Sequence, residues 1–158
     1  MNDTPAATPG LTPRHWIALT ALISAIVATY LHLWKIGLAG TLVCGAGHGC
    51  EVAQFSSYGY FLKQDVALIG AVGYVLIFST ALIGTFPARI NDRRITVALA
   101  ALIIPAFLFT LRLKYGEFIV LKTFCPWCAV SATTITLHVL LVIADWKRAR
   151  RIVHFRAA

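Results

Sequence analysis

The most informative part of the sequence is Cys125-Pro126-Trp127-Cys128, which is followed directly by the apolar run Ala129–Ala144. Two cysteines with this spacing at the beginning of a helix form a redox dithiol arrangement. The helix dipole lowers the pKa of a thiol at this position, and the thiolate is the reactive form. The apolar run is long enough to cross a bilayer with the cysteine motif at its edge. The sequence therefore predicts thiol–disulfide chemistry at a membrane surface.

The composition of the whole chain also favours a membrane protein. Hydrophobic residues make up 59% of the 158 residues and charged residues only 13%, and the mean hydropathy is +0.78. A soluble domain is about 25% charged. A chain of this length normally holds one domain, and this one lacks the polar residues that would coat a soluble core.

Four segments approach the length of about 20 apolar residues that a membrane span needs. They are predicted at about Trp16–Ile36, Val66–Phe86, Ile95–Leu113 and from the C-x-x-C motif to near Trp146. Pro105 predicts a kink in the third span, and the first span is too long for a cleavable signal peptide. The predicted fold is an all-α membrane protein, a four-transmembrane-helix bundle whose redox domain covers residues 16–146.

The distribution of positive charge predicts the orientation of this bundle. Basic residues lie in the connection between the second and third spans and in the C-terminal segment: Arg89, Arg93, Arg94, Lys147, Arg148, Arg150, Arg151 and Arg156. Positive charge near span ends stays in the cytoplasm. We therefore expect both terminal tails, 1–15 and 147–158, to be cytoplasmic, in agreement with Arg14. The basic residues form no groove-sized face with interleaved aromatics, so we expect no nucleic-acid partner.

The orientation places every cysteine of the chain on the outer side of the membrane. The four are Cys44, Cys50, Cys125 and Cys128, and the outer side of a bacterial inner membrane is oxidising. Cys44 and Cys50 flank Gly45-Ala46-Gly47-His48-Gly49, a pliable stretch that can close a small disulfide and also move. An outer loop with one cysteine pair, beside a pair mounted on a helix, is the layout of an electron relay.

Other interpretations of the same cysteines stay open at this point. In one alternative, two structural disulfides hold the outer loops in place. In another, the four thiolates bind Zn²⁺, although the C-x₅-C spacing is loose for zinc and no metal site is expected. His48 is interpreted as a solvated loop residue, with metal ligation or proton transfer as the alternative.

The chain resembles the vitamin K epoxide reductase family in its bacterial form, from the first span to the fourth. The matching segments, in chain order, are Tyr30-Leu31-His32 with Lys35, the pair Cys44 and Cys50, Phe55-Ser56-Ser57-Tyr58-Gly59, Ile69-Gly70-Ala71-Val72-Gly73-Tyr74, and Tyr115-Gly116-Glu117-Phe118 leading to the C-x-x-C motif. The order and the spacing of these segments together carry the resemblance.

The resemblance implies a membrane disulfide–quinone oxidoreductase of the bacterial inner membrane. Such a protein reoxidises a periplasmic thioredoxin-fold (DsbA-like) thiol oxidant and passes electrons from Cys44 and Cys50 to Cys125 and Cys128, and then to ubiquinone or menaquinone. Cys44 is expected to face the partner and Cys50 to relay to Cys125, which comes first in its helix and is expected nearer the surface. Cys128, about one turn deeper, is expected to face the quinone, with its thiolate stabilised by the helix N-terminus. The expected quinone-binding residues are Phe55, Ser57, Ile69, Tyr74, Leu113 and Cys128. Ser56 and Ser57 are also candidates to cap a short interfacial helix.

Two departures from the vertebrate pattern favour a plain quinone as the substrate. Val66 and Ala132 stand where vertebrate members carry the Asn and Tyr that grip the vitamin K head group. The chain also ends at Ala158 without a thioredoxin-like domain, so we expect the thiol partner to be a separate protein. The alternatives are a thiol-driven quinone or vitamin K epoxide reductase and, in another class, a thiol-based metal-ion transporter, which would need cysteines inside a span.

Overall fold

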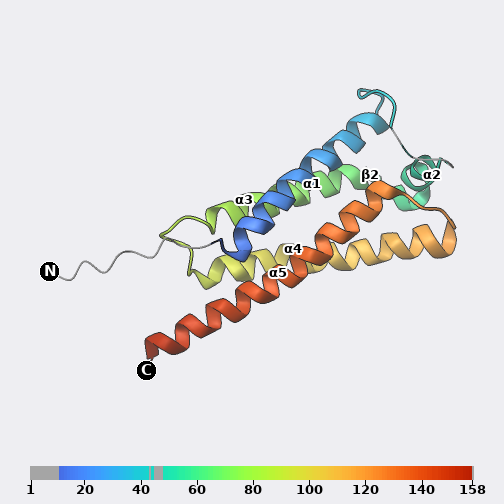
Figure 1. The fold of residues 1–158 in the computed structure, drawn as a ribbon. Coiled ribbons are helices and arrows are strands. Elements are labelled where there is room, and N and C mark those ends of the chain that lie inside the picture. Colours follow the sequence, from blue (N-terminus) through green and yellow to red (C-terminus); the bar gives the residue numbers. More distant parts are fainter. Residues whose placement is uncertain (1–10, 43, 45–47, 158) are drawn as a thin grey trace.

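The computed structural model describes residues 11–42, 44 and 48–157, and its elements are almost all helical (Figure 1). In chain order they are α1 (Pro13–Lys35), α2 (Gly49–Phe55), the short helix η1 (Ser57–Gly59), strands β1 (Tyr60–Phe61) and β2 (Gln64–Asp65), α3 (Val66–Ile83), α4 (Arg93–Tyr115), the π-helical turn η2 (Gly116–Val120) and α5 (Pro126–Ala157).

Four of these helices are long and apolar enough to cross a membrane. The candidate spans are Pro13–Lys35, Val66–Ile83, Arg93–Val120 and Pro126–Arg150. They confirm the predicted four-helix membrane bundle. Helix α5 differs from its predicted span because it continues past Trp146 to Ala157. The segment after Trp146 contains neither glycine nor proline and is rich in arginine, a good helix former, so nothing in it ends the helix.

Residues at the helix ends explain where the spans begin. Pro13 occupies the first turn of α1, where its missing N–H costs nothing. Asp65 and Asp92 cap α3 and α4, and their side chains accept hydrogen bonds from the backbone N–H groups of Ala67 and Arg94. Each cap places an acidic residue at the positive end of a helix dipole.

Small residues line the buried face of α1 and allow it to pack closely. Ala18, Ala21, Ala25 and Ala28 are all buried, and α1 packs chiefly on α3 and α5. Close contact between small residues is a common way for membrane helices to associate. The largest buried apolar side chains of the bundle are Ile17, Ile77, Leu99, Ile103 and Ile135.

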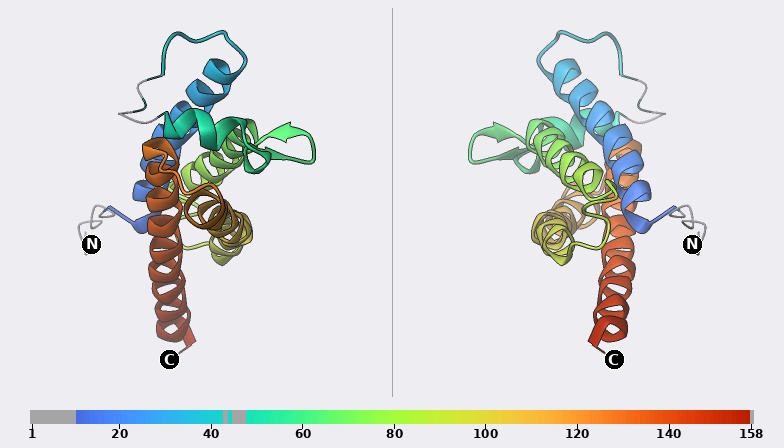
Figure 2. Two further views of the ribbon diagram at one scale, coloured as in Figure 1. Left: turned by 90° about the vertical axis from the view of Figure 1, so that its right-hand side faces the viewer. Right: turned by 90° about the vertical axis from the view of Figure 1, so that its left-hand side faces the viewer.

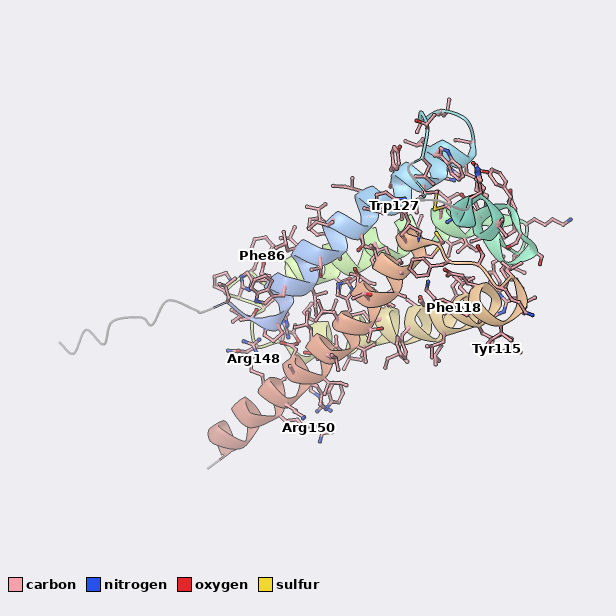
Figure 3. The ribbon with its side chains drawn as sticks, turned by 45° about the vertical axis from the view of Figure 1, so that its right-hand side comes forward. Phe86, Tyr115, Phe118, Trp127, Arg148 and Arg150 are labelled. Carbon is pink, nitrogen blue, oxygen red and sulfur yellow. A yellow bond between two sulfur atoms is a disulfide. The ribbon has the colours of Figure 1, made fainter. Side chains whose placement is uncertain are left out.

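The two ends of the bundle are built differently. At the end that we call the cysteine end, α2, the hairpin of β1 and β2, turn η2 and the start of α5 lie together (Figure 1), and the hairpin projects sideways from the bundle (Figure 2). The opposite end, which we call the arginine end, holds the connection from α3 to α4. In Figure 3, Tyr115, Phe118 and Trp127 lie toward the cysteine end, and Phe86 and Arg148 lie toward the arginine end.

A fully buried arginine closes the arginine end. Arg14 is 0% exposed and forms a salt bridge with Asp145, which is also 0% exposed, at 2.9 Å between Nε and Oδ2. The other N–H donors of Arg14 bond to four oxygen atoms, namely the carbonyls of Gly84, Arg89 and Asp92 and the hydroxyl of Thr96. All five donors of the guanidinium group are therefore paired. Arg14 ties three spans and one connection together, although its sequence position suggested a free cytoplasmic charge.

Candidate functional site

Cys125 occupies the N-cap position of α5. The helix begins at Pro126, and the carbonyl of Cys125 accepts the first helical hydrogen bond from the N–H of Ala129 at 3.0 Å. The Cys125 sulfur accepts a hydrogen bond from the backbone N–H of Cys128, with an N–S distance of 3.3 Å. The sulfur thus takes the place of a capping side chain at the positive end of the helix dipole.

These contacts favour the thiolate of Cys125. A hydrogen bond from the Cys128 side chain holds the pKa of the Cys125 thiol below its ordinary value, and the Cys128 N–H and Lys114 act in the same direction against the effect of burial. Cys125 is fully buried, although it was expected near the surface. The helix N-terminus therefore stabilises a sulfur that is enclosed by protein.

The second cysteine pair lies next to the N-terminus of α5. Cys44 and Cys50 form a disulfide, with 5.7 Å between their Cα atoms. Cys50 lies in the first turn of α2 and is fully buried. A Cβ atom on Gly49 would collide with the carbonyl oxygen of Phe124. This close approach brings the residue before Cys50 against the residue before Cys125. The segment Gly45–Gly47, which the sequence predicts to be pliable, lies outside the described residues.

Helix α2 also reaches the second cysteine of the C-x-x-C motif. The Gln54 side chain, one turn after Cys50, lies with its Nε2 atom 3.7 Å from the sulfur of Cys128. Cys125 and Cys128 are not joined by a disulfide in the structure. The four cysteines predicted from the sequence are therefore brought to one end of the bundle. Their roles in catalysis stay a prediction.

A cavity of about 370 Å³ opens beside Cys128. Its wall is mostly apolar and draws on all four spanning helices and on α2. The volume and lining are those of a small-molecule site, which typically measures about 300–1,000 Å³ and carries few polar groups. Four of the residues expected to bind quinone line this cavity: Ile69, Tyr74, Leu113 and Cys128.

Phe55 and Ser57, the other two expected quinone-binding residues, do not line the cavity. The ring of Phe55 is 55% exposed and packs against Trp34, with 5.7 Å between ring centroids. Ser57 is exposed at the start of η1. Their part in quinone binding stays a prediction. Ser56 has the expected capping role, because its hydroxyl oxygen accepts a hydrogen bond from the Tyr58 N–H at 3.2 Å.

Glycines make room for the cavity. Gly70 and Gly73 both belong to its wall, and a Cβ atom on Gly73 would meet nothing within 4 Å. Ala67 and Ala71 on the same helix are buried. A Cβ atom on Gly70 would lie 3.9 Å from the Cβ of Ala28 on α1, so α3 packs closely on α1 there, whereas Gly73 leaves open space.

Polar groups of the cavity wall are few, and several of them are paired with one another. The Tyr74 hydroxyl lies 2.8 Å from the hydroxyl of Ser131 and donates to its carbonyl at 3.1 Å. Glu117 and Lys114 form an ion pair with 2.7 Å between Oε2 and Nζ. Sequence reasoning missed Gln54, Ser131 and this ion pair as site residues. The only available signal was the position of Glu117 close before the C-x-x-C motif.

His48 matches its interpretation as a solvated loop residue. Its side chain is 82% exposed, and its Nδ1 atom lies 3.2 Å from a carboxylate oxygen of Glu51. The carbonyl of His48 accepts a hydrogen bond from the N–H of Val52, which places His48 at the start of α2.

A membrane bundle with a dithiol at one helix terminus, a disulfide packed against it and an apolar cavity beside one sulfur defines a membrane-bound thiol–disulfide oxidoreductase. Residues 15–143 match the family model described as the vitamin K epoxide reductase family. The chain belongs to that family, and the resemblance noted in the sequence is confirmed. A comparison with curated proteins gave no significant match. Proteins of this family use quinone as an electron acceptor, and the apolar cavity at Cys128 fits a quinone ring.

Proposed function

We propose that the protein is a disulfide–quinone oxidoreductase of a bacterial inner membrane that reoxidises a separate periplasmic thioredoxin-fold (DsbA-like) thiol oxidant. It would thereby support disulfide bond formation in secreted proteins. One observation carries the proposal. Cys128 lines the cavity, while Cys125 lies against the segment that holds the Cys44–Cys50 disulfide.

The charges of the two ends support an orientation with the cysteine end outside. Arg89, Arg93 and Arg94 lie in the connection at the arginine end or at the start of α4, and the basic segment of α5 extends on the same side. Such charges are retained in the cytoplasm. The cysteine end then faces the compartment in which disulfides persist.

The first exchange takes place at Cys44. A thiolate of the partner attacks the Cys44 sulfur, forms a mixed disulfide and releases Cys50 as a thiolate. The second thiolate of the partner then displaces Cys44, so the partner leaves oxidised and the loop pair is reduced. Cys44 suits this role because it is partly accessible, whereas Cys50 is fully buried.

The second exchange passes the electrons inward. Cys50 attacks the sulfur of Cys125 in the Cys125–Cys128 disulfide and releases Cys128 as a thiolate. Cys44 then attacks Cys50, which restores the loop disulfide and releases Cys125 at the N-cap position. The N-cap contacts that stabilise the Cys125 thiolate make it a good leaving group in this step.

The cavity receives the electrons from the reduced pair. A bound ubiquinone or menaquinone supplies an acceptor for two electrons and two protons. Ile69 and Leu113 offer apolar wall to a quinone ring, and Tyr74 and Gln54 offer a hydroxyl and an amide within the same lining. Val66 also lines this cavity, so no amide stands where vertebrate members grip the vitamin K head group.

The test is quinone reduction by the purified protein with a reduced thioredoxin-fold protein as the electron donor. We expect the wild type to reduce a short-chain ubiquinone or menaquinone and Cys44→Ser to lose donor-driven reduction. Full donor-driven activity in Cys44→Ser would overturn the relay. Turnover of vitamin K epoxide without turnover of the plain quinones would favour the alternative substrate.

The order of the relay is tested by trapping. In Cys50→Ala, the free Cys44 thiolate attacks the disulfide of the oxidised partner, in the reverse of the first exchange, and forms a mixed disulfide that Cys50 can no longer resolve. A dithiothreitol-sensitive adduct should therefore accumulate on a non-reducing gel. Cys44→Ala is the matched control. An adduct that accumulates only in Cys44→Ala would exchange the roles of the two loop cysteines and leave the relay itself intact.

A further inference from the structure

Glu117 is a buried carboxylate that the proposed electron route does not use. It lies in the π-helical turn η2 and is 4% exposed. Its Oε1 atom accepts a hydrogen bond from the backbone N–H of Cys125 at 2.6 Å, and its Oε2 atom accepts one from Lys114 at 2.7 Å. An ionised carboxylate in such a position is costly unless it is paired and hydrogen-bonded. Both of its oxygens are engaged in this way.

The two charges of this ion pair act on Cys125 in opposite directions. The negative charge of Glu117 disfavours a thiolate at Cys125, whereas the positive charge of Lys114 favours it. Both side chains line the cavity that Cys128 also lines, and only 5% of the Glu117 side chain and 17% of the Lys114 side chain are exposed. Solvent therefore screens their fields only weakly.

Other charged groups at the cysteine end are placed to have less influence on Cys125. On α2, Glu51 and His48 pair with each other and are exposed. On α4, Arg112 lies 5.7 Å and 5.9 Å from the ring centroids of Tyr58 and Phe61. Lys122 is exposed beyond η2, and Lys35 is bound to Asp65. Among the described residues, the Glu117–Lys114 pair is thus the charged group held directly against the cysteine pair.

We propose that Glu117 is a positioning residue of the Cys125–Cys128 pair. The hydrogen bond from the Cys125 N–H to Glu117 fixes the backbone at Cys125. The negative charge of Glu117, balanced by Lys114, makes the reduced pair a better electron donor. This inference rests on the proposed function. A dithiol whose thiolate is strongly stabilised holds its electrons, as strong thiol oxidants do. By opposing that stabilisation, Glu117 favours oxidation of Cys125 and Cys128 to their disulfide, which releases two electrons and the protons still bound to sulfur.

The test compares two variants that remove one charge each. In Glu117→Gln, the amide oxygen can still accept the Cys125 N–H, but the negative charge is lost and Lys114 is left without its counter-ion. In Lys114→Met, the positive charge is lost. Glu51→Gln and Lys122→Met remove exposed charges at the same end and serve as matched controls.

The readout is the rate of alkylation of Cys125 in the reduced full-length protein, followed by peptide mass spectrometry over a series of pH values. We expect the midpoint of the pH profile to fall by about one unit in Glu117→Gln and to rise by a similar amount in Lys114→Met. The equilibrium of the cysteine pair with a glutathione buffer should move toward the dithiol in Glu117→Gln and toward the disulfide in Lys114→Met.

Shifts of opposite sign are the result that a merely structural role would not produce. Shifts of the same sign in both variants, or shifts no larger than those of the two controls, would overturn the proposal. The readout uses neither quinone nor a thiol partner. A failure of the proposed function would therefore appear in the quinone assay, while a failure of this inference would appear only in the pH profile and the glutathione equilibrium.

Discussion

The arginine end and the cysteine end each bury an ion pair, but only the arginine end is filled with protein. Arg14 and Asp145 are both 0% exposed, and every N–H of the guanidinium group has an acceptor. The corresponding pair at the cysteine end, Lys114 and Glu117, borders the 370 Å³ cavity. One pair closes the bundle, and the other borders a space that a ligand can enter.

The contrast between the two ends shows how one bundle combines stability with reactivity. Stability is not uniform within a protein, and sites that must exchange ligands or disulfides lie in its less tightly packed parts. At the arginine end, Arg14 joins α1 to α4, to α5 and to the connection after α3. The cysteine end can then remain open without separating the helices. Substitutions at the arginine end should therefore chiefly lower the stability of the protein, whereas substitutions beside the cysteines and the cavity should chiefly change electron transfer and quinone binding.

The largest expected effect is a loss of stability when the Arg14–Asp145 ion pair at the arginine end is broken. Arg14→Met removes the 2.9 Å partner of the buried Asp145 and leaves it with the partly exposed Arg148 at 3.3 Å. We therefore expect the free energy of unfolding to fall by about 3 kcal/mol, the lower end of the range for breaking a buried pair. The measurement is unfolding in detergent micelles by titration with a denaturing detergent, followed by circular dichroism. Arg94→Met, which removes an exposed arginine at the same end, is the control and should leave the midpoint almost unchanged.

The double variant Arg14→Met with Asp145→Leu sharpens this prediction. Replacement of both partners of a buried pair costs less than removal of one, because no uncompensated charge remains. We expect the double variant to recover part of the lost stability. Equal destabilisation by the arginine variant and by its exposed control would contradict the role assigned to Arg14.

The next largest effect is expected where the two cysteine pairs meet. Gly49→Val places a side chain against the carbonyl of Phe124, a backbone atom that cannot move aside. Displacement of α2 should slow electron transfer from Cys50 to Cys125 by about a hundredfold, since small misplacements of reacting groups can cost that much. Stopped-flow measurement of the thiol content of each pair gives the rate. Gly40→Val, where a Cβ would meet nothing within 4 Å, is the control and should keep the wild-type rate.

A smaller effect is expected from filling the cavity. Gly73→Leu projects a side chain into space that is open at present, so we expect the KM for quinone to rise about tenfold, equivalent to about 1.4 kcal/mol of binding. Reduction of the Cys44–Cys50 disulfide by dithiothreitol should keep its rate. Val72→Leu, on an exposed part of the same helix, is the control. An unchanged KM in Gly73→Leu would show that the quinone binds elsewhere.

The smallest effect concerns the pH dependence of the cysteine end. Burial would raise the pKa of Asp65, but hydrogen bonds from Lys35, His32 and the Ala67 N–H outweigh it and hold the pKa below the ordinary value of 3.8. A lowered pKa in the folded state means that this stabilisation is present above pH 3.8 and is lost as the pH falls through the folded pKa.

Asp65→Asn keeps the helix cap and removes the charge, so it should cost about 1 kcal/mol at neutral pH and flatten the acid limb of the stability curve. Detergent unfolding between neutral and acid pH measures both effects. Asp92→Asn, which changes the cap of α4 in the same manner, is the control. If stability falls with acid pH in Asp65→Asn as steeply as in the wild type, other groups govern the loss of stability at acid pH.

Sequence reasoning located the features that depend on local composition. The four spans and the C-x-x-C motif at a helix start follow from residues that are neighbours in the chain. It misjudged features that depend on which residues meet in space. Cys125 was expected near the surface because it comes first in its helix, but α2 and η2 cover it, and the helix-terminus contacts fall on Cys125 rather than on the deeper Cys128.

By itself, the sequence determined that this protein crosses a membrane four times and carries two cysteine pairs, because hydropathy and spacing can be evaluated without any partner. Which charges are buried depends on how the helices pack. Arg14 and Glu117 look like ordinary charges at the edge of a membrane span. A charge can be buried only when acceptors or donors converge on it, and those of Arg14 come from residues that lie 70 to 131 positions away in the chain. That convergence is a property of the packed helices, and the cavity beside Cys128 is a property of the same packing.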